Sequence, residues 1–189
     1  MKTTMKNAML VFITIAASTL TAQTQSIDLA ESYIKWVGTK IVPDSHEGTL
    51  NFSSGSLTFE NNVLTAGEFV VDMTSMECTD LEGSSKKKLE KHLKSDDFFG
   101  VASYPEATLT IKEINAQENG NYSVVGDFTI KGITQSVPFT IKSTADTFVA
   151  DVTIDRSKHN VRFGSGSFFD NLGNKAISDD FKLTVTLKL

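Results

Sequence analysis

The strongest constraint on the fold of this chain is a strict alternation of apolar and polar residues. The C-terminus shows it most clearly, where Phe181, Leu183, Val185, Leu187 and Leu189 alternate with lysine and threonine. A period of two is typical of a β-strand with one buried and one exposed face. Similar runs lie at 34–36, 50–52, 69–73, 109–111, 122–130, 137–142 and 148–154. Turn-forming residues such as Glu60-Asn61-Asn62 separate them, so the sequence predicts eight or nine strands in hairpin succession.

One stretch between these runs has a helical period instead. From Ser84 to about Lys94, Leu89 and Leu93 are four residues apart and Glu90 precedes Lys94 by one turn, while Ser84 or Ser85 can cap the start. We therefore predict a short helix there. Its five lysines could serve a membrane surface or a partner, but a solvated helix face explains them without either and is the interpretation we favour. An antiparallel chain of this kind forms either a sandwich or a closed barrel, and the number of strands alone does not distinguish these two folds.

The first 22 residues have the layout of a secretory signal peptide. Lys2 and Lys6 precede an apolar run at 8–17, and a polar, small-residue stretch ends at Ala22. The run has about half of the ~20 residues that a membrane-spanning helix needs. We expect cleavage after Ala22, which leaves one domain over residues 23–189.

Composition excludes several classes of function. The chain has 18 Lys and Arg against 23 Asp and Glu, and no strongly basic tract, which argues against nucleic-acid binding. One cysteine and three histidines offer little for a metal site, and we expect neither a metal nor a cofactor. The run Gly164–Ser167 lacks the spacing of a nucleophile turn, and Asp170–Asn174 lacks the final glutamate of an EF-hand loop, so we expect no enzyme. Cys78 is either buried and inert or able to cross-link two copies, and we favour burial.

Several segments of the chain resemble the YceI-like family. The most specific are His92-Leu93 with Ser95 to Phe99 and Tyr104-Pro105, followed by Gly126-Asp127 with Thr129, Lys131-Gly132 and Thr134. The remaining matches are 34–40, 46–48, 67–76, 155–157 and 163–165. Together they cover nearly the whole of residues 23–189.

The resemblance implies an all-β, lipocalin-like antiparallel β-barrel of about eight strands with one short helix inserted, exported to the bacterial periplasm or secreted. In this family the lumen can hold a polyisoprenoid or similar amphiphilic lipid, for transport, storage or sequestration in the cell envelope. A buried tail gains roughly 0.8 kcal/mol per methylene, so such binding needs no catalytic machinery. The alternative is a stress-related structural or interaction module whose barrel is filled by its own side chains. We expect no nucleic-acid partner and no stable membrane insertion after cleavage. The sequence leaves open whether the protein forms a homodimer.

The resemblance implies a ligand-binding lumen and a mouth, for which the sequence offers two groups of candidate residues. The lumen candidates are Trp36, Phe69, Val71, Phe128, Ile130, Phe139 and Ile141, and the head-group candidates are Lys40, His46, Arg156 and Arg162. Arginine offers a planar fork for phosphate and lysine a point charge. Two alternatives stay open: Arg156 pins its loop by pairing with Asp155, Asp179 or Asp180, and His46 caps a turn. Because Lys40 places a charge at the mouth, a ligand smaller or more polar than a long prenyl chain is also open.

Overall fold

The computed structural model describes residues 21–40 and 44–189, which form one antiparallel sheet. Residues 1–20 of the expected leader lie outside this part. The strands are β1 (Ala22–Ser26), β2 (Tyr33–Lys40), β3 (Ser45–Glu60), β4 (Val63–Cys78), β5 (Glu106–Ala116), β6 (Asn121–Ile130), β7 (Ile133–Thr144), β8 (Thr147–Asp155) and β9 (Ile177–Lys188). The helix α1 (Gly83–Lys94) lies between β4 and β5, and short 3-10 turns span Glu118–Gly120, Arg156–His159 and Gly173–Lys175. Within the described residues, no helix is long and apolar enough to cross a membrane.

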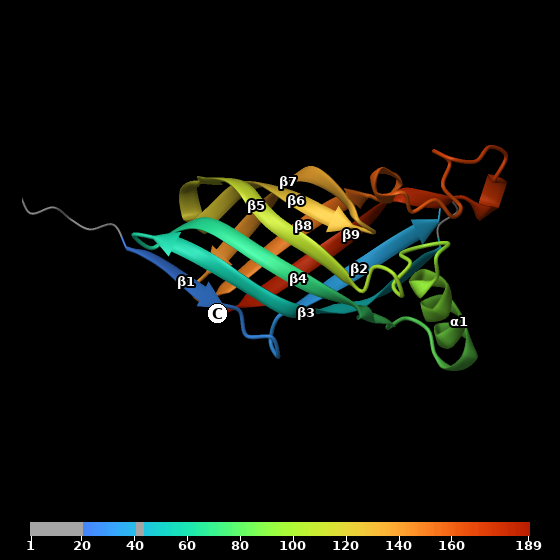
Figure 1. Cartoon of the computed structure of the whole chain (residues 1–189), viewed down its shortest axis with the longest axis horizontal. Coiled ribbons are helices and arrows are strands. Elements are labelled where there is room, and N and C mark those ends of the chain that lie inside the picture. The colour runs from blue at the N-terminus through green and yellow to red at the C-terminus, as the bar shows by residue number, and fades with distance from the viewer. Residues whose placement is uncertain (1–20, 41–43) are drawn as a thin grey trace, which may run out of the picture.

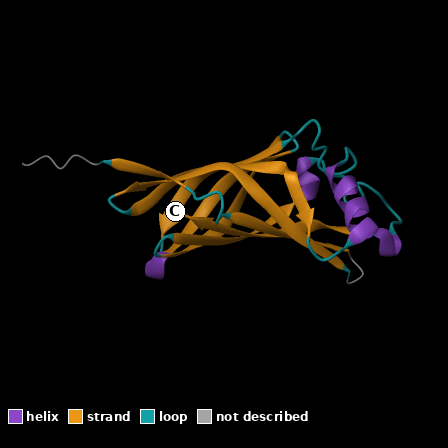
Figure 2. Cartoon of the chain, turned by 90° about the horizontal axis from the view of Figure 1, so that it is seen from below, coloured by secondary structure: helices purple, strands orange, loops and turns teal. Residues whose placement is uncertain are grey.

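The sheet closes on itself because β3 pairs on both sides. The strand order is β1-β3-β2-β9-β8-β7-β6-β5-β4, and β3 also pairs with β4, so β2 to β9 form a closed eight-stranded barrel (Figures 1 and 2). β1 lies in line with β2, since it pairs with Ser56–Glu60 of β3 while β2 pairs with Ser45–Asn51. The predicted antiparallel barrel with one inserted helix is confirmed.

Antiparallel order gives the barrel two different ends. The turns β3–β4, β5–β6 and β7–β8 lie at one end and are short, and Asn61 and Asn62 of the first adopt left-handed φ values of 50° and 64°. Asparagine tolerates this conformation, as the sequence predicted for this turn. The connections that follow β2, β4, β6 and β8 meet at the other end, together with α1 (Figure 1). We call this the mouth end.

Helix α1 lies across the mouth end and is tied to β4 by polar contacts. Glu90 accepts a hydrogen bond from the Cys78 amide at 2.9 Å, and the Lys94 ammonium donates to the Thr74 carbonyl at 2.9 Å. Leu89 and Leu93 face the barrel core, as their spacing predicted. The expected serine cap is wrong by position: the helix begins at Gly83, so Ser84 and Ser85 lie inside the first turn and Glu82 occupies the N-cap without a side-chain cap bond.

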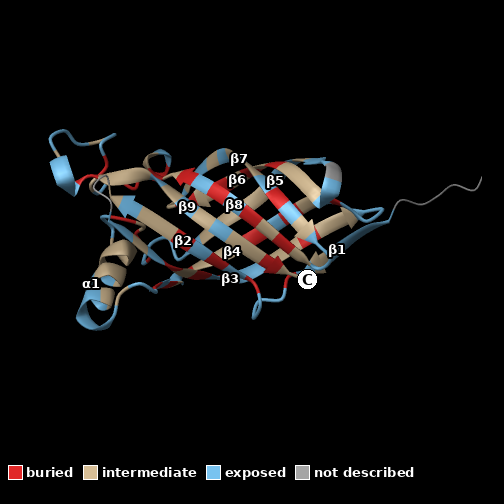
Figure 3. Cartoon of the chain, turned by 180° about the vertical axis from the view of Figure 1, so that it is seen from behind, coloured by how far each residue is buried: buried red, intermediate tan, exposed pale blue. Residues whose placement is uncertain are grey.

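The core follows the alternation seen in the sequence. On β8, Phe148, Ala150, Val152 and Ile154 are all 7% exposed or less, whereas the residues between them face outward (Figure 3). Leu57 and Leu64 flank the β3–β4 turn and are at most 1% exposed, so the barrel is packed solid toward its short-turn end.

Gly48 allows the tryptophan side chain of β2 to lie flat against β3. A Cβ at Gly48 would sit 2.4 Å from Cζ2 of Trp36 and 1.8 Å from the Glu77 carbonyl oxygen. Neither neighbour is a flexible side-chain end, so any larger residue must move the indole, the backbone, or both.

We predict that Gly48→Ala lowers the free energy of unfolding by about 1–3 kcal/mol, because overpacking forces these shifts. Denaturant titration followed by the fluorescence of Trp36, the one tryptophan in the sequence, measures the loss and reports the displaced ring. Gly38→Ala is the matched control, since a Cβ there meets nothing within 4 Å. Equal stability of the two variants would contradict the prediction.

Candidate functional site

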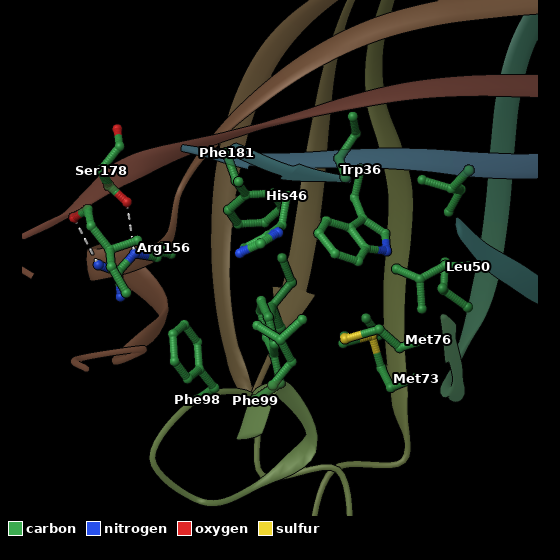
Figure 4. Close-up of a pocket in the computed structure, with 18 of the residues that line it drawn as sticks. Trp36, His46, Leu50, Met73, Met76, Phe98, Phe99, Arg156, Ser178 and Phe181 are labelled. Atoms are coloured by element: carbon green, nitrogen blue, oxygen red, sulfur yellow. Dashed lines mark hydrogen bonds between the residues drawn. The ribbon is translucent and has the colours of Figure 1, made fainter. Parts of the chain in front are cut away.

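The mouth half of the barrel encloses an apolar cavity of about 580 Å³. Its walls come from the inner faces of β2, β3, β4, β5, β6 and β9, and its mouth is bordered by α1, Phe98, Phe99 and Phe163. Among the wall residues are Trp36, Leu50, Met73, Met76 and Phe181 (Figure 4). The wall also includes Ile34, Phe52, Leu109, Leu183 and Val185. A cavity of this size and polarity suits one small apolar or amphiphilic ligand.

Five of the seven residues predicted for the lumen line this cavity: Trp36, Phe69, Val71, Phe128 and Ile130. Phe139 and Ile141, both on β7, lie elsewhere in the described barrel. Ile141 is buried opposite Tyr122 and Ala150, and Phe139 packs edge-on against Phe128 at 5.8 Å. They share the inward face but belong to the packed part of the barrel, so the structure does not bring them to the cavity.

The Trp36 side chain forms part of the cavity wall, and its one polar group, the indole N–H, is hydrogen-bonded. Its ring nitrogen donates to the Thr49 carbonyl oxygen at 3.3 Å, and the residue is 9% exposed. Because the indole N–H is bonded to the strand beside it, the ring offers only carbon surface to the cavity.

Aromatic rings from separate segments border the mouth. The imidazole of His92 on α1 stands edge-on to Phe98 at 5.0 Å and to Phe163 at 4.4 Å between ring centres. Phe99 contacts Phe181 of β9 in the same edge-on manner at 6.1 Å. These contacts join α1, the segment after it and the β8–β9 connection into one apolar border.

Arg156 anchors the β8–β9 connection beneath this border. Its Nε donates to the Ser178 carbonyl at 2.9 Å, Nη1 to the Val161 and Phe163 carbonyls at 2.9 Å, and Nη2 to the Ile177 carbonyl at 3.0 Å (Figure 4). Nη2 also lies 3.4 Å from Asp179 Oδ1, and the residue is 3% exposed. Burial lowers the pKa of Arg156, and Asp179 and Asp155 oppose that shift.

The contacts of Arg156 therefore favour the loop-anchoring alternative over a head-group role. A guanidinium has five N–H groups, and four of them donate to backbone carbonyls. Asp179 Oδ1 lies 3.4 Å from Nη2 and balances the charge without a hydrogen bond. The residue borders the cavity, where its guanidinium carbon lies 5.8 Å from the Phe98 ring centre, but it is only 3% exposed and its charge is already paired with Asp179.

We predict that Arg156→Lys lowers the free energy of unfolding by about 3 kcal/mol. The carbonyls are arranged around the planar guanidinium, and a lysine ammonium cannot reach all of them. The carbonyls that it misses stay buried without a hydrogen-bond donor. Urea unfolding of the two proteins measures the difference. The control is Arg162→Lys, an exposed arginine of the same connection, for which a change within about 0.5 kcal/mol is expected. A small loss for both variants would show that Arg156 does not anchor the connection.

His46 belongs to a polar cluster at the wall of the mouth. Its Nδ1 lies 2.8 Å from Asp80 Oδ2, and Asp80 Oδ1 accepts from the Glu47 amide at 3.0 Å and from the Cys78 thiol at 3.1 Å. Burial raises the pKa of Asp80, but these hydrogen bonds, that of His46 first, outweigh it and lower the pKa to about 2. Cys78 itself is fully buried, as favoured from the sequence, and burial raises the pKa of its thiol.

We predict a pH-dependent loss of stability in Asp80→Asn. Because the folded protein holds the pKa of Asp80 below its ordinary value of 3.8, its stabilisation is complete above about pH 5 and disappears as pH falls toward 2. At neutral pH we expect a loss of about 1–2 kcal/mol relative to the unchanged protein, allowing for partial solvent screening. Thermal or urea unfolding across this pH range measures it, with the exposed Asp170→Asn as control. A difference independent of pH would show that the stabilisation does not come from the Asp80 carboxylate.

The other head-group candidates lie at different places on the mouth. Lys40 borders the cavity and pairs with Asp44, whose pKa it lowers. Arg162 is exposed on the outer side of Phe163, away from the cavity, with its guanidinium stacked 4.7 Å from the Phe168 ring centre. Lys175 borders the cavity and was not nominated from the sequence; in the described part of the chain no carboxylate lies within 4.0 Å of its ammonium.

Sequence reasoning missed several wall residues, some of which it could have found. Leu183 and Val185 stand in the alternation that predicted β9, and Leu93, Phe98 and Phe99 stand in the segment that resembles the family most specifically. Asn174 and Lys175 carry no such signal, because the β8–β9 connection has no period. In the described chain, no three His, Cys, Asp or Glu side chains gather as metal ligands.

A closed eight-stranded antiparallel barrel with an apolar internal cavity places this protein in the lipocalin-like class of folds. A model of the YceI-like domain matches residues 25–189, and the chain belongs to that family. Curated relatives include the UPF0312 protein of Vibrio campbellii, 31% identical over 99 residues, and UPF0312 protein YE1254 of Yersinia enterocolitica, 32% identical over 97 residues. Each match covers 51% of this chain and 48% of the relative, so the chain spans about half the length of these relatives.

Solved structures share the fold over most of their length. BcnA of Burkholderia cenocepacia is 25% identical with a TM-score of 0.67, covering 85% of this chain and 98% of that one. A polyisoprenoid binding domain from Saccharophagus degradans is 16% identical with a TM-score of 0.57, covering 89% and 97%. The YCEI protein of Campylobacter jejuni is 14% identical with a TM-score of 0.53, covering 97% and 92%. The barrel is thus the feature common to all four chains.

Proposed function

We propose that this protein is a non-enzymatic lipid-binding protein that holds a polyisoprenoid or similar amphiphilic lipid in its barrel. The observation that carries the proposal is the 580 Å³ cavity with an apolar wall and charged groups confined to its mouth. An apolar tail inside such a wall gains free energy from every methylene removed from water, while a polar head stays at the wet end. The Saccharophagus degradans domain, described as polyisoprenoid binding, supports the choice of lipid.

The cavity also bears on the alternative of a barrel filled by its own side chains. A filled barrel predicts packed rings and aliphatic chains throughout, as found around Leu57 and Leu64. The mouth half differs, since partly buried side chains such as Val71, Leu109 and Leu183 face open space there. This favours a carrier, storage or sequestering role in the cell envelope, to which the signal peptide would deliver the protein.

For the head group, the proposal assigns the main contact to Lys175. Arg156 is buried, donates to four backbone carbonyls and pairs with Asp179, while Lys40 pairs with Asp44 and His46 with Asp80. Lys175 is exposed at the border of the cavity and retains its donors. A head group with negative charge fits a lysine at this place.

The direct test is mass spectrometry of the protein purified from its own cell envelope. The organic extract is compared with that of an unrelated exported barrel, and the intact mass reports whether residues 1–22 have been removed. A stoichiometric lipid on a chain that begins at Gln23 supports the proposal. A clean extract that stays clean after incubation with prenyl and acyl lipids contradicts lipid binding, and an uncleaved chain contradicts export.

We predict that Val71→Trp abolishes or strongly weakens binding of such a lipid, because the larger side chain fills the cavity that Val71 lines. Val70→Trp is the matched control: it makes the same change one residue away, on the outward face of β4. Binding is followed by displacement of a fluorescent fatty acid or prenyl probe, with circular dichroism as a check on folding. Equal binding by both folded variants would place the ligand outside this cavity.

A further inference from the structure

The outer surface of the mouth end carries features that the cavity does not explain. Helix α1 and the connection 156–176 lie at this same end in all three overall views (Figures 1, 2 and 3), and the His92 ring of α1 meets Phe163 of the connection at 4.4 Å between ring centres. Much of their surface is exposed, and it includes lysines, arginine and two large aromatic side chains. We call the exposed residues of these two segments the rim.

The mouth-end connections, whose exposed surface includes the rim, differ in charge from the rest of the protein. The connections that follow β2, β4, β6 and β8 contain ten Lys or Arg against seven Asp or Glu, whereas the remaining residues from 23 onward contain six against sixteen. A positive end on an acidic body makes the molecule electrically polar, so that an anionic surface attracts the mouth and repels the barrel wall.

Three lysines on α1 are free to meet such a surface. Lys86 is held by Glu77, and Lys94 donates to the Thr74 carbonyl, whereas Lys87, Lys88 and Lys91 are exposed. In the part of the chain that the structure describes, no carboxylate lies within 4.0 Å of these three ammonium groups. They lie on the side of α1 opposite Leu89 and Leu93, which face the core.

The other half of the rim presents aromatic rings to solvent. Phe163 is 42% exposed and Phe169 is 48% exposed, although folding normally removes such rings from water. The Arg162 guanidinium lies 4.7 Å from the Phe168 ring centre and 5.9 Å from that of Phe169. Exposed phenylalanine beside a stacked cation is the composition of surfaces that sit at a lipid–water interface.

A groove on this surface adjoins the cavity. About 520 Å³ in volume, it lies on the outer side of Phe163 and includes Arg162, Phe169 and Leu172 in its walls. Phe163 and Lys175 border both the groove and the cavity. A molecule bound beside the rim aromatics is therefore separated from the cavity by the side chains of Phe163 and Lys175.

We propose that the rim docks on the surface of an anionic lipid bilayer, with Phe163 and Phe169 at the interface and the α1 lysines against lipid phosphates. Docking in this orientation turns the mouth of the barrel toward the membrane. The proposal goes beyond the function proposed above and concerns the outer surface alone, so it does not require that the cavity hold a lipid.

The test is co-sedimentation with vesicles of phosphatidylcholine, with and without phosphatidylglycerol, at low ionic strength. The protein is produced from residue 21 onward, which retains every described strand and leaves out residues 1–20, the part of the predicted leader whose apolar run would bind vesicles by itself. We expect binding to the phosphatidylglycerol vesicles, little binding to pure phosphatidylcholine, and weakening by added salt, because screening shortens the reach of the rim charges.

Two pairs of variants separate the rim from the barrel wall. The triple change Lys87→Gln, Lys88→Gln and Lys91→Gln should lower vesicle affinity about 10- to 100-fold. Its control changes three exposed lysines of the wall, Lys35, Lys142 and Lys182, to Gln and should leave affinity unchanged. Phe169→Ser should weaken binding, whereas Leu29→Ser, at 46% exposure away from the mouth, should not. Circular dichroism verifies that each variant is folded.

Three outcomes would overturn the proposal: equal binding to both kinds of vesicle, absence of binding to either, or equal loss from the rim and wall triple variants. Sedimentation velocity tests whether a second copy of this chain, rather than a membrane, binds the rim. A dimer that Phe169→Ser dissociates, in a protein that ignores vesicles, would assign the rim to a second copy of this chain and also overturn membrane docking.

Discussion

The pairing of β3 with β4 turns an open sheet into a barrel, and the remaining features of the molecule depend on this closure. Closure removes the sheet edges that would otherwise pair with other chains, except along β1. It also directs every second side chain of β2 to β9 into one enclosed space, whose width is fixed by the strand number. A space of fixed width is either filled by side chains or left open. In this barrel the half near the short turns is filled, and the half near the mouth is open.

The difference between the two halves lies in what each inward position carries. Toward the short turns, Leu57, Leu64 and Val124 belong to the buried core, are at most 1% exposed and do not line the cavity. Toward the mouth, the rings of Trp36 and Phe69 lie against the wall because Gly48, Gly55 and Gly67 offer no Cβ to hold them off. Large side chains that lie flat along a wall cover it without filling the centre. The unfilled volume forgoes packing energy that a bound apolar ligand would restore.

The sequence predicted the strands well because their signal is local. Alternation placed Phe148 to Ile154 and Phe181 to Leu187 correctly, since a period of two needs no knowledge of neighbours. It could not separate Val71 from Ile141: both face inward, but their distance from the mouth depends on strand register, which is a non-local property. Arg156 was ambiguous for a similar reason. Its carbonyl partners come from the β8–β9 connection and from β9 itself, and no local pattern encodes where those backbones meet.

The antiparallel order explains why the chemistry gathers at one end. Strands that run alternately up and down place every second connection at the same end, so a chain can keep one set of turns tight and lengthen the other. Here the long members of the mouth set are 79–105 and 156–176, which supply α1, Phe98, Phe99 and Phe163 of the border, and the cations of the rim. Arg156 holds the second of these against β9, and Glu90 and Lys94 hold the first against β4. The barrel supplies an apolar interior of fixed width, and its two long connections decide what can approach that interior and from which surface.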